Sequence, residues 1–444
     1  MRPIELPNFP LVNLPIADIK PYLTNSWLHP ERQIEMLEAS YARFGVISPI
    51  IATPDGELIA GHLRHIVATR VGLPSIPAII VPHLNETERQ ALRIADNSIS
   101  QKGEWSLELL ASQIEIVLSA DLEIDPISIG FETGEIDAIA FTGERAPKPS
   151  ASPQEPDRTR PAVARVGDHF RIGTHTVVCG DAKEWKTFEA ALAGRKATAV
   201  ISDQPWNLQA RFISGKGRLQ HPNFVEGFGE KSEAEFRAFT EQVLSNQARC
   251  CHPGALVFQF IDWRSVDVMI AAGKQSVGNL VALCVWVKHA KGMGSPWRSQ
   301  HELVCVFRVG SGKSKNNVKL GAYGRNRSNV WYYDAPTGFG PERVKLKLHP
   351  TCKNESMIAD AILDCTDRGD VVLDAFLGSG TTALAAHKVK RIAVGIELDC
   401  HYVDLAVNRL AEATGETPLH HSGRTFEEIR SDRSSGSPDH VGGR

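Results

Sequence analysis

Residues 372–386 read VLDAFLGSGTTALAA, and this stretch decides the fold class of the chain. An apolar run ends in the acid Asp374, and a turn with Gly378 and Gly380 leads into a run of small residues. This order predicts a buried strand, a tight loop and a helix that begins at Thr381. Glycine lets the backbone approach a ligand closely, and the helix start offers unpaired N–H groups, so the stretch is typical of a nucleotide-type cofactor loop.

Strand and helix signals alternate on the amino-terminal side of this loop and continue after it. The expected strands are 176–179, 197–202, 255–260, 281–287, 371–373 and 391–396, with helices that end near 192 and span 233–248 and 381–387. Such alternation predicts an α/β domain with a doubly wound, mostly parallel sheet. Ligands of these sheets bind beside the carboxyl ends of strands, where Asp181, Asp203, Asp374 and Glu397 are expected.

Composition divides the chain, which at 444 residues is too long for one ordinary core. Residues 144–162 are rich in proline, serine and charge and predict a flexible linker. Residues 416–444 predict a disordered tail. The expected domains are therefore a smaller one over 1–143 and a larger one over 163–415.

Charge and cysteine content narrow the class of protein. A formal net charge of -3 argues against nucleic-acid binding by bulk electrostatics, so such binding needs a local basic surface. The eight cysteines form no C-x-x-C pair and follow no secretory leader, which favours reduced thiols in a cytoplasmic protein. Apolar runs stay well short of the roughly 20 residues that cross a bilayer.

The glycine loop alone is compatible with more than one cofactor. Residues 378–383 match G-x-G-x-x-A, and Glu397 follows at the distance where an acid binds ribose hydroxyls, so a dinucleotide-dependent oxidoreductase stays open. A P-loop is excluded, because the lysine of G-x-x-x-x-G-K-[ST] is missing. The carboxylate of Asp374 directly before the loop would repel a pyrophosphate.

A second segment, Asp203-Gln204-Pro205-Trp206, follows the strand expected over 197–202. The Asp203 carboxylate and the Gln204 backbone carbonyl can accept both hydrogens of a planar exocyclic amine and localise its lone pair. Pro205 fixes the chain direction, and Trp206 offers a face on which an extruded base can stack. The structural alternative is an Asx-type turn that caps the strand, with Trp206 in the core.

With the Asp203 segment first in the chain and the glycine loop second, the two resemble the catalytic and cofactor motifs of DNA amino-methyltransferases of the permuted beta class. The resemblance implies the S-adenosylmethionine-dependent methyltransferase fold, S-adenosyl-L-methionine as cofactor, no metal, and direct in-line transfer to a flipped base. In this family the acid at Asp374 faces the methionine amino group, the acid at Asp181 lies near adenine, and the segment 349–353 closes over the methionine end. The implied cofactor-binding residues are Asp181, Lys353, Asp374, Phe376, Gly378, Ser379, Gly380, Thr381 and Glu397.

The resemblance also implies a substrate class. Aspartate at position 203 resembles the adenine-N6 enzymes, whereas serine is commoner there among cytosine-N4 enzymes, so adenine N6 in duplex DNA is the expected target. Cytosine-N4 methylation is the alternative, and RNA or protein methyltransferases would share the cofactor. The family usually has proline where Gln204 and Asn354 stand, and a freer backbone at Gln204 leaves open a slower enzyme or a catalytically weak DNA-binding regulator.

Residues 286–348 supply the local basic surface and fall where the permuted enzymes keep their target-recognition region. Lysines and arginines alternate there with asparagines and aromatic residues, as in surfaces that follow a phosphate backbone and read base edges. The candidate DNA-binding residues are Lys288, Arg298, Asn317, Lys319, Arg325 and Arg327. A solvated basic loop is the alternative. Double-stranded DNA is the expected partner, and restriction-modification is the implied setting.

The smaller domain has its own signature, in which a hairpin over 49–60 precedes Gly61-His62-Leu63-Arg64 and a helix. A strand, a glycine and a helix with basic groups in its first turn suit phosphate binding. Residues 14–100 resemble the α+β nucleotide-binding domain of the ParB/sulfiredoxin type, with Gly61, His62 and Arg64 at the box that contacts phosphates. DNA association or regulation is the implied role, a nucleotide ligand and a homodimer stay open, and ordinary helix-start residues are the alternative.

Overall fold

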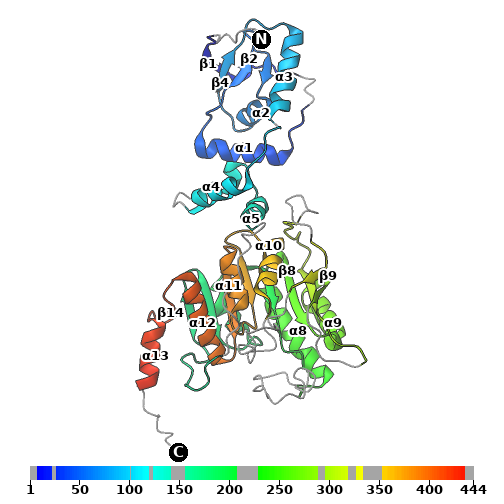
Figure 1. Cartoon of the computed structure of the whole chain (residues 1–444), viewed down its shortest axis with the longest axis vertical. Coiled ribbons are helices and arrows are strands. Elements are labelled where there is room, and N and C mark those ends of the chain that lie inside the picture. The colour runs from blue at the N-terminus through cyan, green and yellow to red at the C-terminus, as the bar shows by residue number, and fades with distance from the viewer. Residues whose placement is uncertain are drawn as a thin grey trace, which may run out of the picture. The chain divides into compact units, whose positions relative to one another are not determined.

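The computed structural model describes residues 8–22, 27–100, 102–119, 124–141, 156–207, 229–288, 296–318, 327–333 and 353–435. The chain divides into two compact units, Met1–Ala140 and Phe141–Arg444 (Figure 1). Most of the expected linker, residues 144–155, lies outside the described residues. Its last part is anchored on the larger unit, because the Arg158 guanidinium donates to Asp399 Oδ2 over 2.6 Å. No helix in the described ranges is long and apolar enough to span a membrane.

The smaller unit is an α+β sheet domain, as predicted. Its sheet has the order β1-β4-β2-β3, with β1 (Leu11–Pro15), β2 (Ile50–Ala52), β3 (Leu58–Ala60) and β4 (Ser75–Ile80). Its helices are α1 (Glu31–Phe44), α2 (His62–Arg70), α3 (Glu86–Ser100), α4 (Leu107–Ser119) and α5 (Thr133–Phe141). β2 and β3 pair antiparallel in the expected hairpin. The fully buried Ile50, Leu58 and Ile76 form the centre of its core.

The larger unit contains one mixed sheet with the order β11-β9-β10-β8-β7-β12-β13-β6-β5-β14. Its strands are β5 (His169–Ile172), β6 (His175–Cys179), β7 (Ala197–Ser202), β8 (Cys251–Ile261), β9 (Gly278–Val287), β10 (His301–Val309), β11 (Val330–Tyr332), β12 (Val371–Asp374), β13 (Ile392–Glu397) and β14 (Leu419–His420). The five central strands from β8 to β6 are parallel. β10 runs antiparallel to both of its neighbours, β8 and β9.

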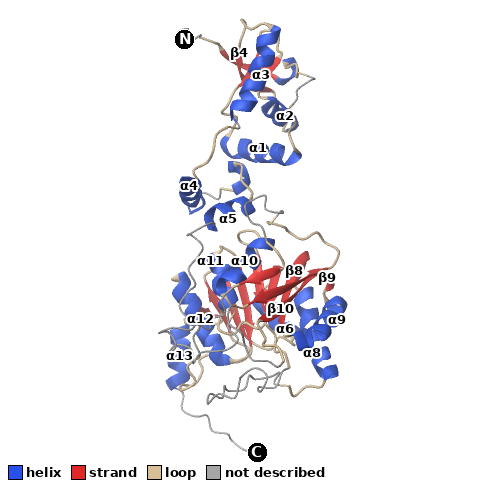
Figure 2. Ribbon diagram, turned by 45° about the vertical axis from the view of Figure 1, so that its right-hand side comes forward, coloured by secondary structure: helices blue, strands red, loops and turns tan. Residues whose placement is uncertain are grey.

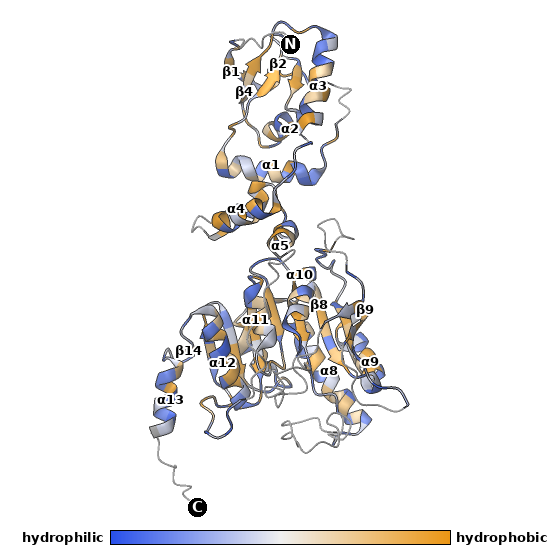
Figure 3. Cartoon of the chain, viewed as in Figure 1, coloured by the Kyte–Doolittle hydropathy of each residue, from blue (hydrophilic) through white to orange (hydrophobic). Residues whose placement is uncertain are grey.

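Helices cover both faces of this sheet (Figure 2). They are α6 (Trp185–Leu192), α8 (Glu233–Arg249), α9 (Val266–Ser276), α10 (Glu355–Cys365), α11 (Thr381–Lys388), α12 (Cys400–Thr414) and α13 (Phe426–Ser435). One hydrophobic core joins the sheet to α6, α8 and α9, and a second joins it to α10, α11 and α12. The strands between these layers are apolar along their length, as a strand buried on both faces must be (Figure 3). The predicted doubly wound, mostly parallel α/β fold is confirmed.

Sequence reasoning missed β10, which lies inside the region 286–348 that was expected to serve target recognition. Its middle residues Val304, Cys305 and Phe307 are buried to 3% exposure or less, because β10 sits between two other strands. The surrounding lysines and arginines masked this apolar run. Part of the expected recognition region is therefore a structural strand of the sheet.

The predicted disordered tail is wrong for its described part. β14 pairs with β5 at the sheet edge, and α13 packs on the domain through Phe426, whose ring lies 5.3 Å from the ring of Phe170 in an edge-to-face contact. Phe426 and Ile429 lie one helical turn apart and are both buried. This short apolar stripe orders the helix, although the surrounding composition is charged.

Arg433 fixes the end of α13, and its replacement tests that attachment. The Arg433 guanidinium donates to both carboxylate oxygens of the buried Asp168. We expect Arg433→Met to lower the free energy of unfolding by about 1–3 kcal/mol, since a buried carboxylate loses a charged partner. Urea titration of the full chain measures the change. Glu427→Gln is the control, because Glu427 lies on the same helix in an exposed pair with Arg430.

The stability lost in Arg433→Met should become smaller as the pH falls. Burial raises the pKa of Asp168, but hydrogen bonds from Arg433 and His420 outweigh burial and hold the pKa at about 2. A carboxyl whose folded pKa is depressed stabilises the fold above its unfolded pKa of about 4 and loses that contribution as the pH falls toward 2. The difference between wild type and Arg433→Met should therefore shrink on acidification. A difference that stays constant would contradict the ion pair.

Candidate active site

The two motifs of the larger unit begin at the same edge of the sheet. β7 and β12 are neighbouring parallel strands, with Val200 paired to Leu373. Asp203 follows β7 and Asp374 ends β12, so both acids lie at carboxyl ends of adjacent strands. Burial is the main cause of the raised pKa of Asp374, and the negative charge of Asp203 adds to it. The fold brings the Asp203 segment and the glycine loop into one neighbourhood.

The glycine loop has the backbone that its sequence requires. Gly378 and Gly380 have φ angles of +52° and +86°, in the left-handed region that favours glycine. A Cβ atom on Gly380 would also lie 3.2 Å from Cβ of Ala406 on α12, so the loop packs closely there. α11 begins at Thr381, as predicted. The loop thus presents its backbone and the first turn of a helix beside the end of β12.

Two carboxylates flank this loop, the buried Asp374 and the partly buried Glu397. Asp374 is 5% exposed and accepts the Phe376 N–H over 3.0 Å, and burial raises its pKa to about 6. Glu397 accepts the N–H of Gly378 through Oε2 and of Asp399 through Oε1, both over 2.8 Å. Burial raises the pKa of Glu397 to about 7. Glu397 therefore orders the loop directly, in addition to any contact with a ligand.

The other expected cofactor residues lie along the same edge, with one exception. Asp181 follows β6, the neighbour of β13, and its carboxylate accepts the Lys183 N–H over 2.8 Å. Phe376 and Ser379 belong to the loop, where the Ser379 carbonyl accepts a hydrogen bond from Arg409. The exception is Lys353, which lies at the Asp203 segment instead.

Asp203 faces a chain of alternating charges. Its Oδ2 lies 2.7 Å from Nζ of Lys353, which also lies 3.1 Å from Oε2 of Glu302. The other oxygen of Glu302 pairs with Lys288. Burial raises the pKa of Asp203, and Lys353 partly offsets that effect. Burial also opposes the charge of Lys353, but the two acids outweigh it and raise the lysine pKa.

The rest of the segment is held by the strands and helices around it. The Gln204 side chain is 1% exposed and donates to Oγ1 of Thr240 on α8 over 3.0 Å. The half-buried Trp206 donates its indole N–H to the Phe260 carbonyl of β8 over 3.2 Å. Pro205 lies between these two anchors. The hydrogen bond to Thr240 anchors the Gln204 side chain. It thereby limits the backbone freedom that is expected at this position when glutamine replaces proline.

Asn354 also has a local role at the position where proline is usual. Its Oδ1 accepts the Met357 N–H over 3.0 Å and caps the first turn of α10. Asparagine is among the preferred N-cap residues, whereas proline has no side-chain acceptor. This departure therefore starts a helix in a different way.

Three of the expected DNA-binding side chains, Lys288, Asn317 and Arg327, form hydrogen bonds or ion pairs inside the domain. Lys288 pairs with Glu302. The Asn317 amide donates to the Leu363 and Thr366 carbonyls over 3.0 and 2.7 Å. Direct DNA contact by these side chains would require breaking internal bonds, so the structure argues against that role.

Arg327 is the third expected DNA-binding residue whose side chain is bonded inside the domain. Its guanidinium bonds Asp364 and Asp360 over 3.0 and 3.2 Å. The i, i+4 spacing of the two acids on α10 is the sequence signal that could have revealed this pairing. Arg298 is exposed, and Lys319 and Arg325 lie outside the described residues.

Glu302 was not identified from the sequence. It stands near the start of the apolar run of β10 and is 8% exposed. A lone acid in a buried strand is a signal in itself, because a buried charge needs a partner. Its partners, Lys288 and Lys353, could not be read from spacing, since Lys353 follows it only after 51 positions.

In the smaller unit, the three expected phosphate-binding residues surround the start of α2. Gly61 is the N-cap with φ +94°, and a Cβ there would lie 2.9 Å from Cγ2 of Ile50. Arg64 donates to the Pro49 carbonyl over 3.2 Å. Burial lowers the pKa of His62 to about 4, and the nearby Arg93 adds to the effect. His62 is therefore neutral near pH 7 and offers an N–H group, while the positive charge comes from arginine.

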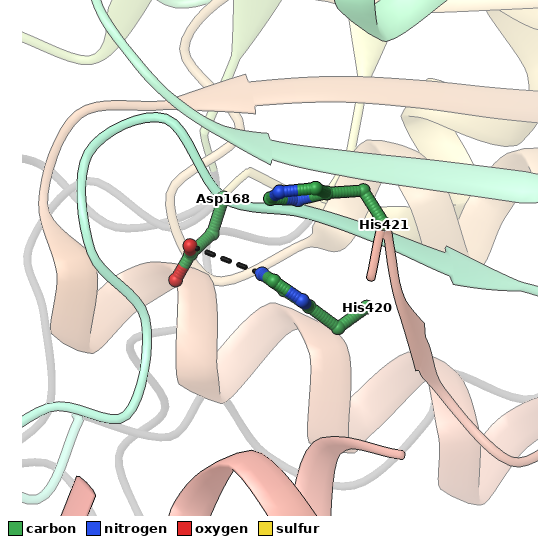
Figure 4. A group of neighbouring side chains, drawn as sticks. All are labelled: Asp168, His420 and His421. Atoms are coloured by element: carbon green, nitrogen blue, oxygen red, sulfur yellow. Dashed lines mark hydrogen bonds and ion pairs between the residues drawn. The ribbon is translucent and has the colours of Figure 1, made fainter. Parts of the chain in front are cut away.

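One group of potential metal ligands lies together in the described part of the chain, namely Asp168, His420 and His421 (Figure 4). His420 Nε2 lies 3.1 Å from Oδ1 of Asp168. The Arg433 guanidinium bonds both oxygens of the same carboxylate. A metal ion would have to displace this guanidinium from Asp168. We therefore interpret the three residues as the anchor of α13 and not as a metal centre.

Comparison with known proteins agrees with this geometry. Residues 197–408 match the N6_N4_Mtase family model, which describes a DNA methylase. The chain is 40% identical over 103 residues to type II methyltransferase M.ScaI of Streptomyces caespitosus, covering 23% of this chain and 34% of the relative. It is 24% identical over 229 residues to M.HpaI of Haemophilus parainfluenzae, covering 48% and 67%. The chain thus spans about one third and two thirds of the length of these curated relatives.

Solved structures resemble each unit at low identity. The M1.HpyAVI–SAM complex matches with 22% identity and a TM-score of 0.39 over 53% of this chain and 98% of that chain. A C-terminally truncated chromosome-partitioning protein ParB from Caulobacter crescentus, complexed with CTP-gamma-S, matches with 19% identity and a TM-score of 0.26 over 29% and 76%. The family match itself runs from β7 to α12 and includes both motifs. Residues 197–408 of this chain are therefore similar to the N6_N4_Mtase family of DNA methylases.

Proposed function

We propose that the chain transfers a methyl group from S-adenosyl-L-methionine to adenine N6 in duplex DNA. The observation that carries this proposal is the common origin of the Asp203 segment and the glycine loop at the carboxyl ends of the adjacent parallel strands β7 and β12. A base held by the first segment would then face a methyl donor held by the second. The match of residues 197–408 to the model of a DNA methylase family supports DNA as the substrate class.

The Asp203 segment has an acceptor of the kind that an exocyclic amine needs. Oδ2 of Asp203 is paired with Lys353, whereas Oδ1 is shielded from solvent and accepts no hydrogen bond from any described residue. An unpaired, desolvated acceptor is costly unless a ligand satisfies it. We assign Oδ1 of Asp203 and the backbone carbonyl of Gln204 to the two hydrogens of the target amine. Trp206, anchored through its indole N–H, would stack against the flipped base.

The transfer step then balances without a covalent enzyme intermediate. The amine nitrogen forms a bond to the methyl carbon, the sulfur–methyl bond breaks, and its electron pair stays on sulfur. The nitrogen carries an extra proton at that point and releases it to water afterwards. Asp203 contributes by localising the lone pair and by opposing the positive charge that develops on nitrogen.

The acids around the loop fit the proposed cofactor, which supplies an electrophilic methyl group. Asp374 would pair with the ammonium of its methionine part, and Glu397 would accept hydrogen bonds from ribose hydroxyls. Asp181, after β6, would lie toward adenine. In their ionised forms Asp374 and Glu397 fit a cationic and hydroxyl-rich ligand better than a pyrophosphate, and a cationic ligand would favour these ionised forms although burial raises both pKa values.

Tritiated S-adenosyl-L-methionine tests the proposal when it is incubated with the full chain and duplex DNA, RNA or protein. We expect label in DNA alone, and chromatography of the digested nucleosides should find it in N6-methyladenine. Label in N4-methylcytosine would keep the enzyme class and correct the base. Label in RNA or protein, or none at all, would contradict the proposal. A binding titration with nicotinamide dinucleotides tests the oxidoreductase alternative.

We further propose that the smaller unit binds nucleotide phosphates at the start of α2 and so couples the enzyme to DNA association. Gly61 allows close approach, His62 offers an N–H group, and Arg64 supplies charge. We expect Arg64→Ala to weaken the binding of nucleoside triphosphates about tenfold, the value of a charge-assisted hydrogen bond. Fluorescence titration with the four common triphosphates measures it.

Arg70→Ala is the matched control for this prediction. Arg70 lies at the other end of α2 and pairs with Glu38 over 2.7 Å and with Glu31. Its loss should leave nucleotide affinity unchanged. If both variants weaken binding equally, or if the wild type binds none of the four nucleotides, the phosphate assignment is wrong.

A further inference from the structure

A buried lysine joins the carboxylate of the proposed target site to a second acid. Nζ of Lys353 lies 2.7 Å from Oδ2 of Asp203 and 3.1 Å from Oε2 of Glu302. The Lys353 and Glu302 side chains are 8% and 9% exposed. The resemblance to known enzymes implied a place for Lys353 beside the methionine end of the cofactor. Its position beside Asp203 calls for a different role.

Aromatic rings complete the surroundings of this ammonium group. Nζ of Lys353 lies 5.1 Å from the ring centroid of Trp206 and 5.0 Å from that of Phe260. Both distances are within the range of cation–π attraction. Two carboxylates and two ring faces therefore fix the ammonium, and the side chain that would stack the target base is one of its walls.

The charges in this cluster are balanced. Asp203, Lys353, Glu302 and Lys288 alternate in sign along the chain of ion pairs, so the group carries no net charge when all four are ionised. Glu302 shares the ammonium of Lys353 and so weakens its hold on Asp203. Oδ1 of Asp203 is left without a hydrogen bond from any residue that the structure describes.

We propose that Lys353 is a positioning residue for methyl transfer, holding one oxygen of Asp203 so that the other faces the target amine, and that Glu302 sets the strength of this hold. The inference rests on the proposed function, since it assigns the role of Asp203 to an amine acceptor. Without Lys353, Asp203 could rotate and present either oxygen. Without Glu302, Lys353 would draw more of the negative charge of Asp203 toward itself.

Lys353 and Glu302 shift the pKa of Asp203 in opposite directions. The pH dependence of the transfer rate therefore distinguishes a positioning role from a merely structural one. Burial raises the pKa of Asp203, Lys353 and Lys288 lower it, and Glu302 raises it. Asp374, on β12, interacts with the same carboxylate. Transfer requires ionised Asp203, so the acidic limb of the rate profile follows this pKa.

Single-turnover methylation rates against pH provide the test, with saturating cofactor and duplex DNA. Lys353→Met should reduce the rate about 10–100-fold, because the acceptor is misplaced, and should move the acidic limb to higher pH. Glu302→Gln should move the acidic limb to lower pH. Lys353→Arg, which keeps the charge, should recover the acidic limb of the wild type. Cofactor affinity should change by less than about twofold in all three.

Lys315→Met is the control, because Lys315 also bridges two acids, Asp367 and Asp370, outside this cluster. Its pH profile should match the wild type. Opposite shifts for Lys353→Met and Glu302→Gln support the inference, and Glu302→Gln keeps it testable if Lys353→Met does not fold. Shifts in one direction, no shift, or loss of cofactor binding with Lys353→Met overturn it. A wild-type chain without methyl transfer at any pH overturns the proposed function first, and the inference with it.

Discussion

Replacing Asp203 with alanine should abolish methyl transfer while the affinity for S-adenosyl-L-methionine stays nearly unchanged. The variant would lose the charged acceptor that we propose to localise the lone pair of the amine and to oppose the charge that develops on nitrogen. Removing one such group from a preorganised site costs about 10²–10³ in rate. In this variant Lys353 would keep Glu302 as its acidic partner but would no longer have its charge offset by Asp203. We therefore expect a rate reduced about 10³-fold or more. We assign cofactor binding to a different set of side chains, at the ends of β12 and β13.

Single-turnover kinetics and isothermal titration measure the two quantities separately. Asp203→Asn gives a closer isostere and should also be strongly impaired, because a neutral amide is a weaker acceptor than a carboxylate. Asp267→Asn is the matched control, since Asp267 is an exposed aspartate on α9. Normal methylation by Asp203→Ala would show that the amine is held elsewhere. Loss of cofactor affinity in Asp203→Ala would instead assign Asp203 to the cofactor.

Glu397→Gln should raise the dissociation constant of the cofactor about 10–100-fold, which corresponds to the loss of a charge-assisted hydrogen bond worth about 1.5–3 kcal/mol. The carboxylate accepts the N–H groups of Gly378 and Asp399 and is proposed to accept ribose hydroxyls as well. An amide keeps one acceptor but turns an NH₂ group toward a donor. Glu412→Gln, an exposed position on α12, should leave the affinity unchanged. Equal affinity in both variants would exclude Glu397 from the cofactor site.

The same acids predict how cofactor binding varies with pH. Burial raises the pKa of Glu397 to about 7 and that of Asp374 to about 6 in the free protein. Only the ionised forms pair with an ammonium group or accept two hydrogen bonds, so binding must release any proton that these acids hold. Affinity should therefore fall as the pH is lowered from about 8 to about 5. Isothermal titration across this range measures the change, and Glu397→Gln should remove its upper part. An affinity that is constant with pH would contradict these assignments.

Local sequence patterns were sufficient for the elements that carry the site. An acid follows the apolar run of β7 and another ends β12, and the glycine pair after Asp374 has the positive φ angles that its spacing requires. Because parallel strands present their carboxyl ends at one edge, the proximity of Asp203 and the loop followed from the class of fold. These features depend on residues close together in the sequence.

Contacts between distant residues were not predictable in the same way. Lys353 was assigned to the cofactor from its motif, yet it pairs with Asp203, 150 positions earlier. Arg327 counted as a DNA contact from its charge, although two acids on α10 bind it inside the domain. Helix α13 is held on the domain by the packing of Phe426 against Phe170. The average composition of a segment does not reveal a single aromatic contact of this kind. Charge and composition describe a segment, whereas its partners decide its role.

Asp203 and the loop at Gly378 must act on one amine and one methyl donor at a single edge of the sheet. Mass spectrometry of nucleosides from duplex DNA, incubated with S-adenosyl-L-methionine and either wild-type chain or Asp203→Ala, tests this requirement most directly. We predict N6-methyladenine with the wild type and none above background with the variant. Unmodified nucleosides with the wild type, or equal amounts of N6-methyladenine with both proteins, would contradict it.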